Sequence, residues 1–173
     1  MSEFTHRLDR IISQGLGANE LPMYVSPSLY NAAGNIIGIA HIHPEAGTIN
    51  PYTDKSLRES LGQWGRLRDV DSLMILEEPP AGTSSNYDVL MHVFEPRGND
   101  ISGLPGGFST MCGNGSRAVA DYLLGQESQT GQVVIMTLSG PRTVIKENGL
   151  FVVNMGELTT SPADLARHGY VNA

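Results

Sequence analysis

The chain contains one cysteine, Cys112, which stands at the start of the stretch "CGNGSRAVADYLL". A helix-like apolar pattern begins after the glycines, so we expect the thiol at a helix N-terminus, where unpaired N–H groups and the helix dipole favour a thiolate. The N–H groups of 113–116 can hold a carboxylate, and Gly113 and Gly115 let a ligand approach the backbone closely. This combination suits removal of a proton next to a carboxylate. The competing interpretation is a buried structural cysteine, but such a residue does not need flanking glycines.

Other catalytic chemistries have weaker support in the sequence. None of the five histidines stands in a recognisable cysteine-protease context. The stretch "HIHP" (41–44) places two imidazoles on one strand face, but without a third ligand at a known spacing we expect no metal site. Lys55 and Lys146 are the only lysines, and neither resembles the buried Schiff-base lysine that pyridoxal phosphate requires. We therefore do not expect pyridoxal phosphate as a cofactor.

Composition limits the possible partners and compartments. The 173 residues carry a formal net charge of −7, with no basic stripe, so nucleic-acid binding is not expected. No apolar run approaches the roughly 20 residues of a membrane span. The polar start "MSEFTHRLDR" lacks the apolar core of a signal peptide, and a lone cysteine forms no internal disulfide. These features predict a cytoplasmic protein without a membrane partner.

The elements that must position the thiol are a helix and several short strands. The stripe formed by Ala118, Val119, Tyr122 and Leu123 predicts a helix over 113–124, ended by Gly125. Thr53 or Asp54 can cap a second helix, whose apolar face repeats at 57, 61 and 64. We expect "RGNDISGLPGGFST" to be a glycine-rich loop. The expected strands are 34–43, 71–80, 87–96 and three more within 132–157.

Five motifs, in order, resemble those of the diaminopimelate epimerase family. They are "GLGANEL" (15–21), "DVDSLMILEEPP" (69–80), "FEPRG" (94–98), "MCGNGSR" (111–117) and "VNMGE" (153–157). The resemblance spans about 150 residues. It implies an α+β fold, in which a curved, mostly antiparallel sheet or barrel wraps around a central helix.

The resemblance also implies a reaction, cofactor-independent racemisation or epimerisation of an amino acid. In this family one cysteine from each of two similar domains faces the substrate; one removes the α-proton and the other returns a proton from the opposite face. General acid–base groups must lie within hydrogen-bond reach of the carbon that they serve. Helix-end dipoles would stabilise the charge that develops on the carboxylate. The implied substrate is an amino acid or a close derivative.

Site residues follow from the resemblance position by position. Cys112 matches the catalytic cysteine of the N-terminal domain. Five further positions match substrate-contacting residues, namely Asn19, Ser72, Glu95, Gly113 and Asn114. Ser72 and Glu95 replace a glutamine and an asparagine of the family, Ala18 is an additional residue, and a loop around "ISGLPGGFS" is inserted. These departures put diaminopimelate itself in doubt more than chemistry at an α-carbon.

The chain matches only the N-terminal half of this family and contains no second cysteine. We therefore expect residues 1–157 to form an epimerase-like domain and 158–173 to be a linker or a docking tail. Another chain or a second domain would supply the other cysteine; a truncated sequence and a homodimer that pairs two copies of Cys112 are the alternatives. A single-cysteine isomerase or lyase, or a non-catalytic binding subunit, is the other functional interpretation.

Overall fold

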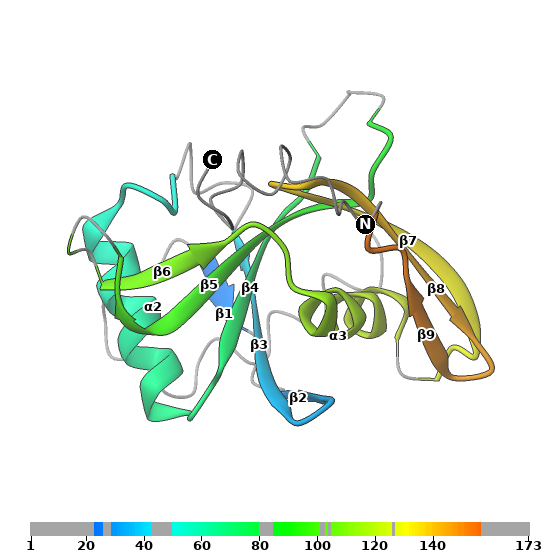
Figure 1. Ribbon diagram of the computed structural model, residues 1–173, viewed down its shortest axis with the longest axis horizontal. Helices are drawn as coiled ribbons and strands as arrows, with labels where there is room; N and C mark the ends of the chain where they lie inside the picture. The colour runs from blue at the N-terminus through cyan, green and yellow to red at the C-terminus, as the bar shows by residue number, and fades with distance from the viewer. Residues whose placement is uncertain are drawn as a thin grey trace, which may run out of the picture.

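The computed structural model describes residues 23–25, 29–42, 50–79, 85–100, 103, 105–125 and 127–156. Within these residues the chain forms two helices and a nine-stranded sheet (Figure 1). The helices are α2 (Lys55–Leu67) and α3 (Gly113–Leu124). The strands are β1 (Met23–Val25), β2 (Tyr30–Ala32), β3 (Asn35–Ile42), β4 (Ser72–Glu77), β5 (Val89–Asn99), β6 (Pro105–Ser109), β7 (Thr130–Thr137), β8 (Gly140–Glu147) and β9 (Leu150–Val153).

The sheet is mixed. Its strand order is β1-β3-β4-β5-β7-β8-β9, with β2 paired to β3 and β6 paired to β5. The pairs β3–β4 and β5–β7 are parallel, and all other described pairs are antiparallel. Figure 1 shows that β7, β8 and β9 turn away from the plane of β3 to β5, so the sheet is strongly curved. The expected predominance of antiparallel neighbours holds within this mixed arrangement.

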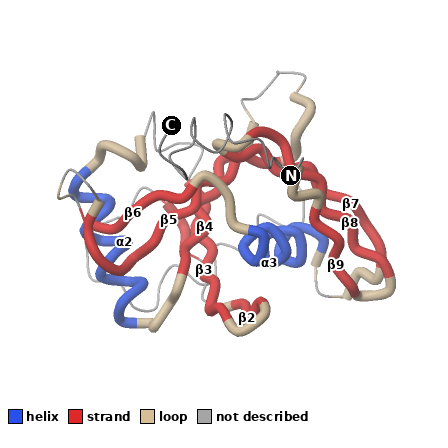
Figure 2. The backbone as a smooth tube through the Cα atoms, in the orientation of Figure 1, coloured by secondary structure: helices blue, strands red, loops and turns tan. Residues whose placement is uncertain are grey.

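The two helices lie on opposite sides of strands β3 to β5 (Figure 2). Asp54 caps α2 by accepting a hydrogen bond from Leu57 N, 2.9 Å away, as one of the two predicted caps. Leu57, Leu61 and Trp64 are buried, as their spacing indicates, and pack against Leu73, Ile75 and Phe94 on one face of the sheet. Helix α2 therefore covers the face of the sheet that lies opposite α3.

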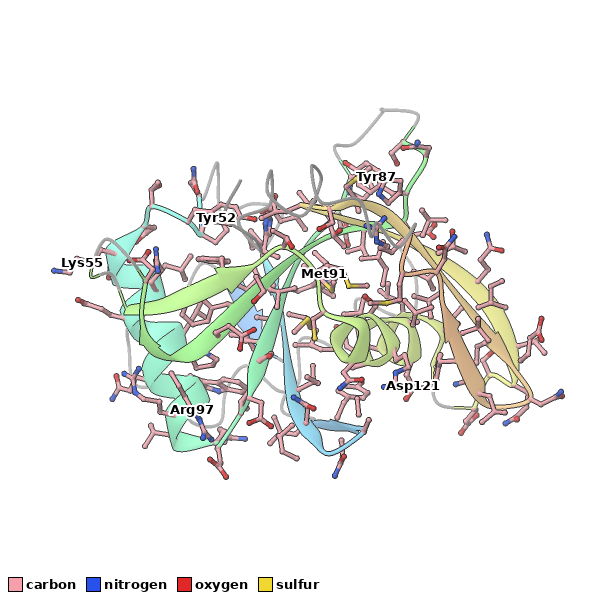
Figure 3. All side chains as sticks on the ribbon, viewed as in Figure 1. Tyr52, Lys55, Tyr87, Met91, Arg97 and Asp121 are labelled. Carbon is pink, nitrogen blue, oxygen red and sulfur yellow. The ribbon has the colours of Figure 1, made fainter. Side chains whose placement is uncertain are left out.

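Helix α3 begins and ends where the sequence predicts. Its buried Ala118 and Val119 pack with Met74 and with Met91, which is labelled in Figure 3, on the face of the sheet opposite α2. The helix contacts β2, β3 and β4 on one side and β7, β8 and β9 on the other. A sheet that wraps around a central helix remains a prediction of the family resemblance.

One prediction of local structure is wrong. The stretch 97–110 is not a single loop, because β5 continues to Asn99 and residues 105–109 form β6. Proline is tolerated as the first residue of a strand, where its missing N–H does little harm. Gly106 is required inside β6, because a Cβ there would lie 2.9 Å from Glu95 O and would overlap the ring of Phe94. Of the glycines that suggested a loop, Gly106 thus serves close packing, whereas a Cβ on Gly98, Gly103 or Gly107 would meet open space.

Two predictions concern segments outside the described residues. The stretch "GLGANEL", with Asn19, and the proposed tail 158–173 both lie there, so the predicted boundary after residue 157 remains a prediction. In the described part of the chain, no helix has the length and the apolar character needed to cross a bilayer.

Candidate functional site

Cys112 is the N-cap residue of α3. Its backbone is extended, and its Sγ accepts a hydrogen bond from Gly115 N at 3.2 Å. Its carbonyl accepts the first helical bond, from Ser116 N at 2.8 Å. Two of the first helical N–H groups, those of Gly113 and Asn114, have no acceptor within the described part of the chain. The thiol, which is half-buried, therefore stands beside two unpaired donors at the positive end of a helix.

The two glycines that follow the thiol have different roles. A Cβ on Gly115 would lie 2.8 Å from Met74 Cε and still closer to Met74 Sδ. A Cβ on Gly113 would meet only Met155, with its Sδ at 3.2 Å. Gly115 is thus required for packing of α3 on the sheet, whereas the expectation of close ligand approach applies to Gly113.

Ser72 and Glu95, two of the predicted binding residues, contact each other. The Ser72 hydroxyl donates to Glu95 Oε2 at 3.2 Å, and the Ser109 hydroxyl donates to Glu95 Oε1 at 3.1 Å. The carboxylate is thus held between β4 and β6 with one hydroxyl on each oxygen. Sequence reasoning missed Ser109, because the register of β5 with β6 places it there.

This hydroxyl–carboxylate cluster lies on the same face of the sheet as α3. Side chains alternate along a strand, so Ser72 shares its face with Met74, and Glu95 shares its face with Val93. Met74 and Val93 both belong to the core that packs against α3. Ser109 precedes Cys112 by three residues in the sequence. The cluster therefore lies at the end of α3 that carries the thiol.

The side chain of Asn114 is held by other protein groups. Its Nδ2 donates to Asn35 Oδ1 at 3.1 Å, and its Oδ1 accepts a hydrogen bond from the guanidinium of Arg117. Asn35 begins β3, so this contact ties the start of α3 to the sheet. The backbone N–H of Asn114 is therefore better placed than its amide side chain to bind a ligand.

A cation that sequence reasoning missed lies on the other side of the helix start. Arg142 donates from its guanidinium to Pro141 O at 2.9 Å and to Ser139 O at 2.8 Å. Ser139 Oγ in turn donates to Thr110 O at 3.4 Å, two residues before the thiol. No spacing rule marks Arg142, because strand pairing and a turn bring it to this position.

The described residues suggest acid–base chemistry and anion binding. They contain no group of three or more His, Cys, Asp or Glu side chains that could hold a metal ion. Asn19 lies outside them. Of the other predicted site residues, Ser72 and Glu95 contact each other, and Cys112, Gly113 and Asn114 are consecutive at the start of α3. That these two groups form one site remains a prediction.

Comparison with known proteins gives only distant similarities. No family model and no curated protein matches the chain. Among solved structures, a phenazine biosynthesis PhzC/PhzF protein from Clostridium difficile matches with a TM-score of 0.46 and 15% identity, covering 86% of this chain and 51% of that chain. A PhzF-family protein from Bacillus anthracis matches with a TM-score of 0.41 and 18% identity, covering 74% of this chain and 36% of that chain. A PhzF-family protein from Enterococcus faecalis matches with a TM-score of 0.43 and 12% identity, covering 83% of this chain and 49% of that chain.

The chain thus spans about half, or less, of the length of these proteins. The PhzC/PhzF family shares the diaminopimelate-epimerase-like fold. The specific resemblance to diaminopimelate epimerase remains a prediction.

Proposed function

We propose that this chain is one half of a cofactor-independent isomerase that racemises or epimerises an amino acid at its α-carbon. The observation that carries the proposal is the position of Cys112, with its sulfur at the N-cap of α3 beside the N–H groups of Gly113 and Asn114, which have no acceptor among the described residues. A base and an anion-binding group are thereby adjacent, which is what proton removal next to a carboxylate requires.

In this proposal the substrate carboxylate accepts hydrogen bonds from the N–H groups of Gly113 and Asn114. The Cys112 thiolate takes the α-proton, the C–H electron pair moves into the carboxylate, and the N–H groups stabilise the added negative charge. The hydrogen bond from Gly115 N to Sγ keeps the sulfur oriented toward the substrate. Glu95, on the same side of the sheet, supplies a negative charge for the substrate ammonium group.

Inversion requires a second acid on the opposite face of the α-carbon. The described residues contain one cysteine only, and the chain spans about half of the length of the structures that it resembles. We therefore propose that a partner chain or a second domain supplies the second acid, most simply another cysteine. A homodimer in which two copies of Cys112 face one substrate is the alternative arrangement.

The test is exchange of the α-hydrogen in deuterated water. The purified chain is incubated with a panel of L- and D-amino acids that includes the stereoisomers of diaminopimelate, and α-deuterium is measured by mass spectrometry. Exchange by the wild-type chain, lost by a factor of roughly 1,000 or more in Cys112→Ala, supports the assigned base. Exchange that persists undiminished in that variant overturns it.

A second candidate is a binding subunit without catalysis. Cys112 caps a helix, and the side chain of Asn114 is satisfied by Asn35 and Arg117, so part of the helix start has a structural role. Calorimetric titration with the same panel separates the candidates. Binding without exchange, both in the chain alone and with a partner chain added, supports a binding subunit and contradicts the isomerase.

A further inference from the structure

Arg142 is a cation with no carboxylate partner among the described residues. Within them its guanidinium donates to the carbonyls of Pro141 and Ser139, at 2.9 and 2.8 Å. Its Nε is buried and has no hydrogen-bond partner in the same part of the chain. Arg58, Arg97, Lys55 and Lys146 form ion pairs with described acids, whereas Arg66, Arg68, Arg117 and Arg142 do not. Of these four arginines, Arg142 is the one with a buried side-chain nitrogen that no described group bonds. A half-buried charge without a counter-charge costs free energy that an anionic ligand can offset.

Strand geometry directs Arg142 toward α3. Residues 142, 144 and 146 share one face of β8 because side chains alternate. Val144 is buried in the core that includes α3, and Lys146 Nζ binds Asp121 Oδ1, in the C-terminal half of α3, at 2.7 Å. Arg142, at the opposite end of this row, therefore lies on the side where α3 begins.

Three contacts connect Arg142 with the flanks of Cys112. The carbonyl that it binds belongs to Ser139, whose hydroxyl donates to Thr110 O. A Cβ on Gly156 would lie 3.3 Å from an Arg142 Nη atom, so the guanidinium lies against that glycine. The neighbouring Met155 reaches Gly113, the first residue of α3. The guanidinium is thus held beside the segment that carries the thiol.

We propose that Arg142 binds the carboxylate of the molecule on which Cys112 acts, together with the backbone N–H groups of Gly113 and Asn114. The assignment of that carboxylate to an amino acid rests on the proposed function; the carboxylate preference itself does not. Glu95 projects from β5 on the same face of the sheet as α3, and Arg142 projects from β8 beside Gly156, whose neighbour Met155 reaches Gly113. A zwitterion would be oriented with its ammonium group toward Glu95 and its carboxylate toward Arg142. This arrangement assigns Arg142 as a substrate-binding and orienting residue.

The lone cysteine allows a test that needs no knowledge of the substrate. Iodoacetate and iodoacetamide both alkylate a thiolate, forming a C–S bond as iodide leaves, but only iodoacetate carries a carboxylate. The ratio of the two second-order rate constants cancels the thiolate fraction, because both reagents react with the same sulfur. The ratio is measured for wild type, Arg142→Gln, Arg142→Lys and the remote charge control Arg68→Gln, and normalised to a free thiol.

We expect Arg142→Gln to lower the iodoacetate-to-iodoacetamide ratio by roughly tenfold, as one charge-assisted hydrogen bond implies. Arg142→Lys should retain part of the ratio, and Arg68→Gln should leave it unchanged, although it removes the same net charge. Equal rate changes for both reagents in Arg142→Gln, or an unchanged ratio, overturn the proposal. The alkylation ratio measures carboxylate recognition alone and does not depend on isomerase activity. If deuterium exchange is absent and the isomerase proposal fails, the ratio still tests the role of Arg142.

Discussion

The thioether of Met74 occupies the space in which a Cβ on residue 115 would lie, so that Gly115 and Met74 fix the distance between α3 and the sheet. We expect Gly115→Ala to destabilise the fold by about 1–3 kcal/mol, because the added methyl group forces Met74 or the helix to move. Gly113→Ala, whose Cβ would meet only the exposed Met155, is the matched control and should cost less. Urea unfolding of both variants measures the difference. The packing argument is wrong if the two variants are equally stable.

Glu95 should matter more for ligand binding than for the fold. Glu95→Gln retains one acceptor oxygen, and the hydroxyls of Ser72 and Ser109 can rotate to accept from the new amide, so we expect at most about 1 kcal/mol of destabilisation. Loss of the charge should shift the amino-acid concentration needed for half-maximal deuterium exchange upward by roughly tenfold. The control Ser72→Ala keeps the carboxylate and should shift it far less. An unchanged concentration dependence in Glu95→Gln would contradict a role in ammonium binding.

The buried ion pair between Lys146 and Asp121 should stabilise the contact of α3 with β8. Lys146 Nζ lies 2.7 Å from Asp121 Oδ1 and 5.0 Å from the ring centroid of Phe151, and its side chain is 4% exposed. Among the described groups, Asp121→Leu leaves the ammonium group with the Gly125 carbonyl, at 3.4 Å, and the Phe151 ring, and should cost about 3 kcal/mol. Adding Lys146→Met to this variant should recover most of the loss. Thermal unfolding of the single and double variants measures these losses. If the loss of stability in the double variant equals the sum of the losses in the two single variants, the two side chains are not coupled and the prediction is wrong.

His41 should make stability depend on pH. Burial lowers the pKa of its imidazole below 6.5, although the charge of Glu78 opposes the shift, and the ring lies edge-on to Tyr122. The folded state therefore prefers the neutral ring, so its contribution is complete above pH 6.5 and is lost as the pH falls toward the lowered folded value. We expect wild type to lose more stability than His41→Phe between pH 7.5 and pH 5. Urea titrations of both proteins at these pH values test this, and parallel pH profiles would refute it.

Local sequence signals were sufficient for both helices. The stripe of 118, 119, 122 and 123 and the glycine at 125 predict the observed bounds of α3, because each signal acts within one helical turn or at a cap. Asp54 and the apolar spacing of α2 succeed for the same reason. The wrong prediction of a loop at 97–110 also has a local cause. Glycine and proline usually indicate a loop, but here Gly106 is needed for the ring of Phe94 to pack beneath β6.

The site could be predicted only in part. The resemblance identifies Ser72, Glu95 and Cys112 one by one. It does not identify Ser109, which strand register places against Glu95, or Arg142, which binds the turn between β7 and β8. Register depends on contacts between segments far apart in the sequence, which single-sequence patterns do not encode. The same patterns suggested that glycines 113 and 115 both serve a ligand, although Met74 accounts for the second one.

The position of β6 has a consequence for how this protein can vary. Pro105, the first residue of β6, lies at the end of that strand away from Cys112, and only three residues connect Ser109 to the start of α3. A change in chain length between β5 and β6 would leave this short connection unchanged, because β6 stays paired with β5 and separates the two. Insertions between β5 and β6 can therefore accumulate without displacing the Cys112 sulfur, as long as Asp100 keeps its ion pair with the buried Arg58.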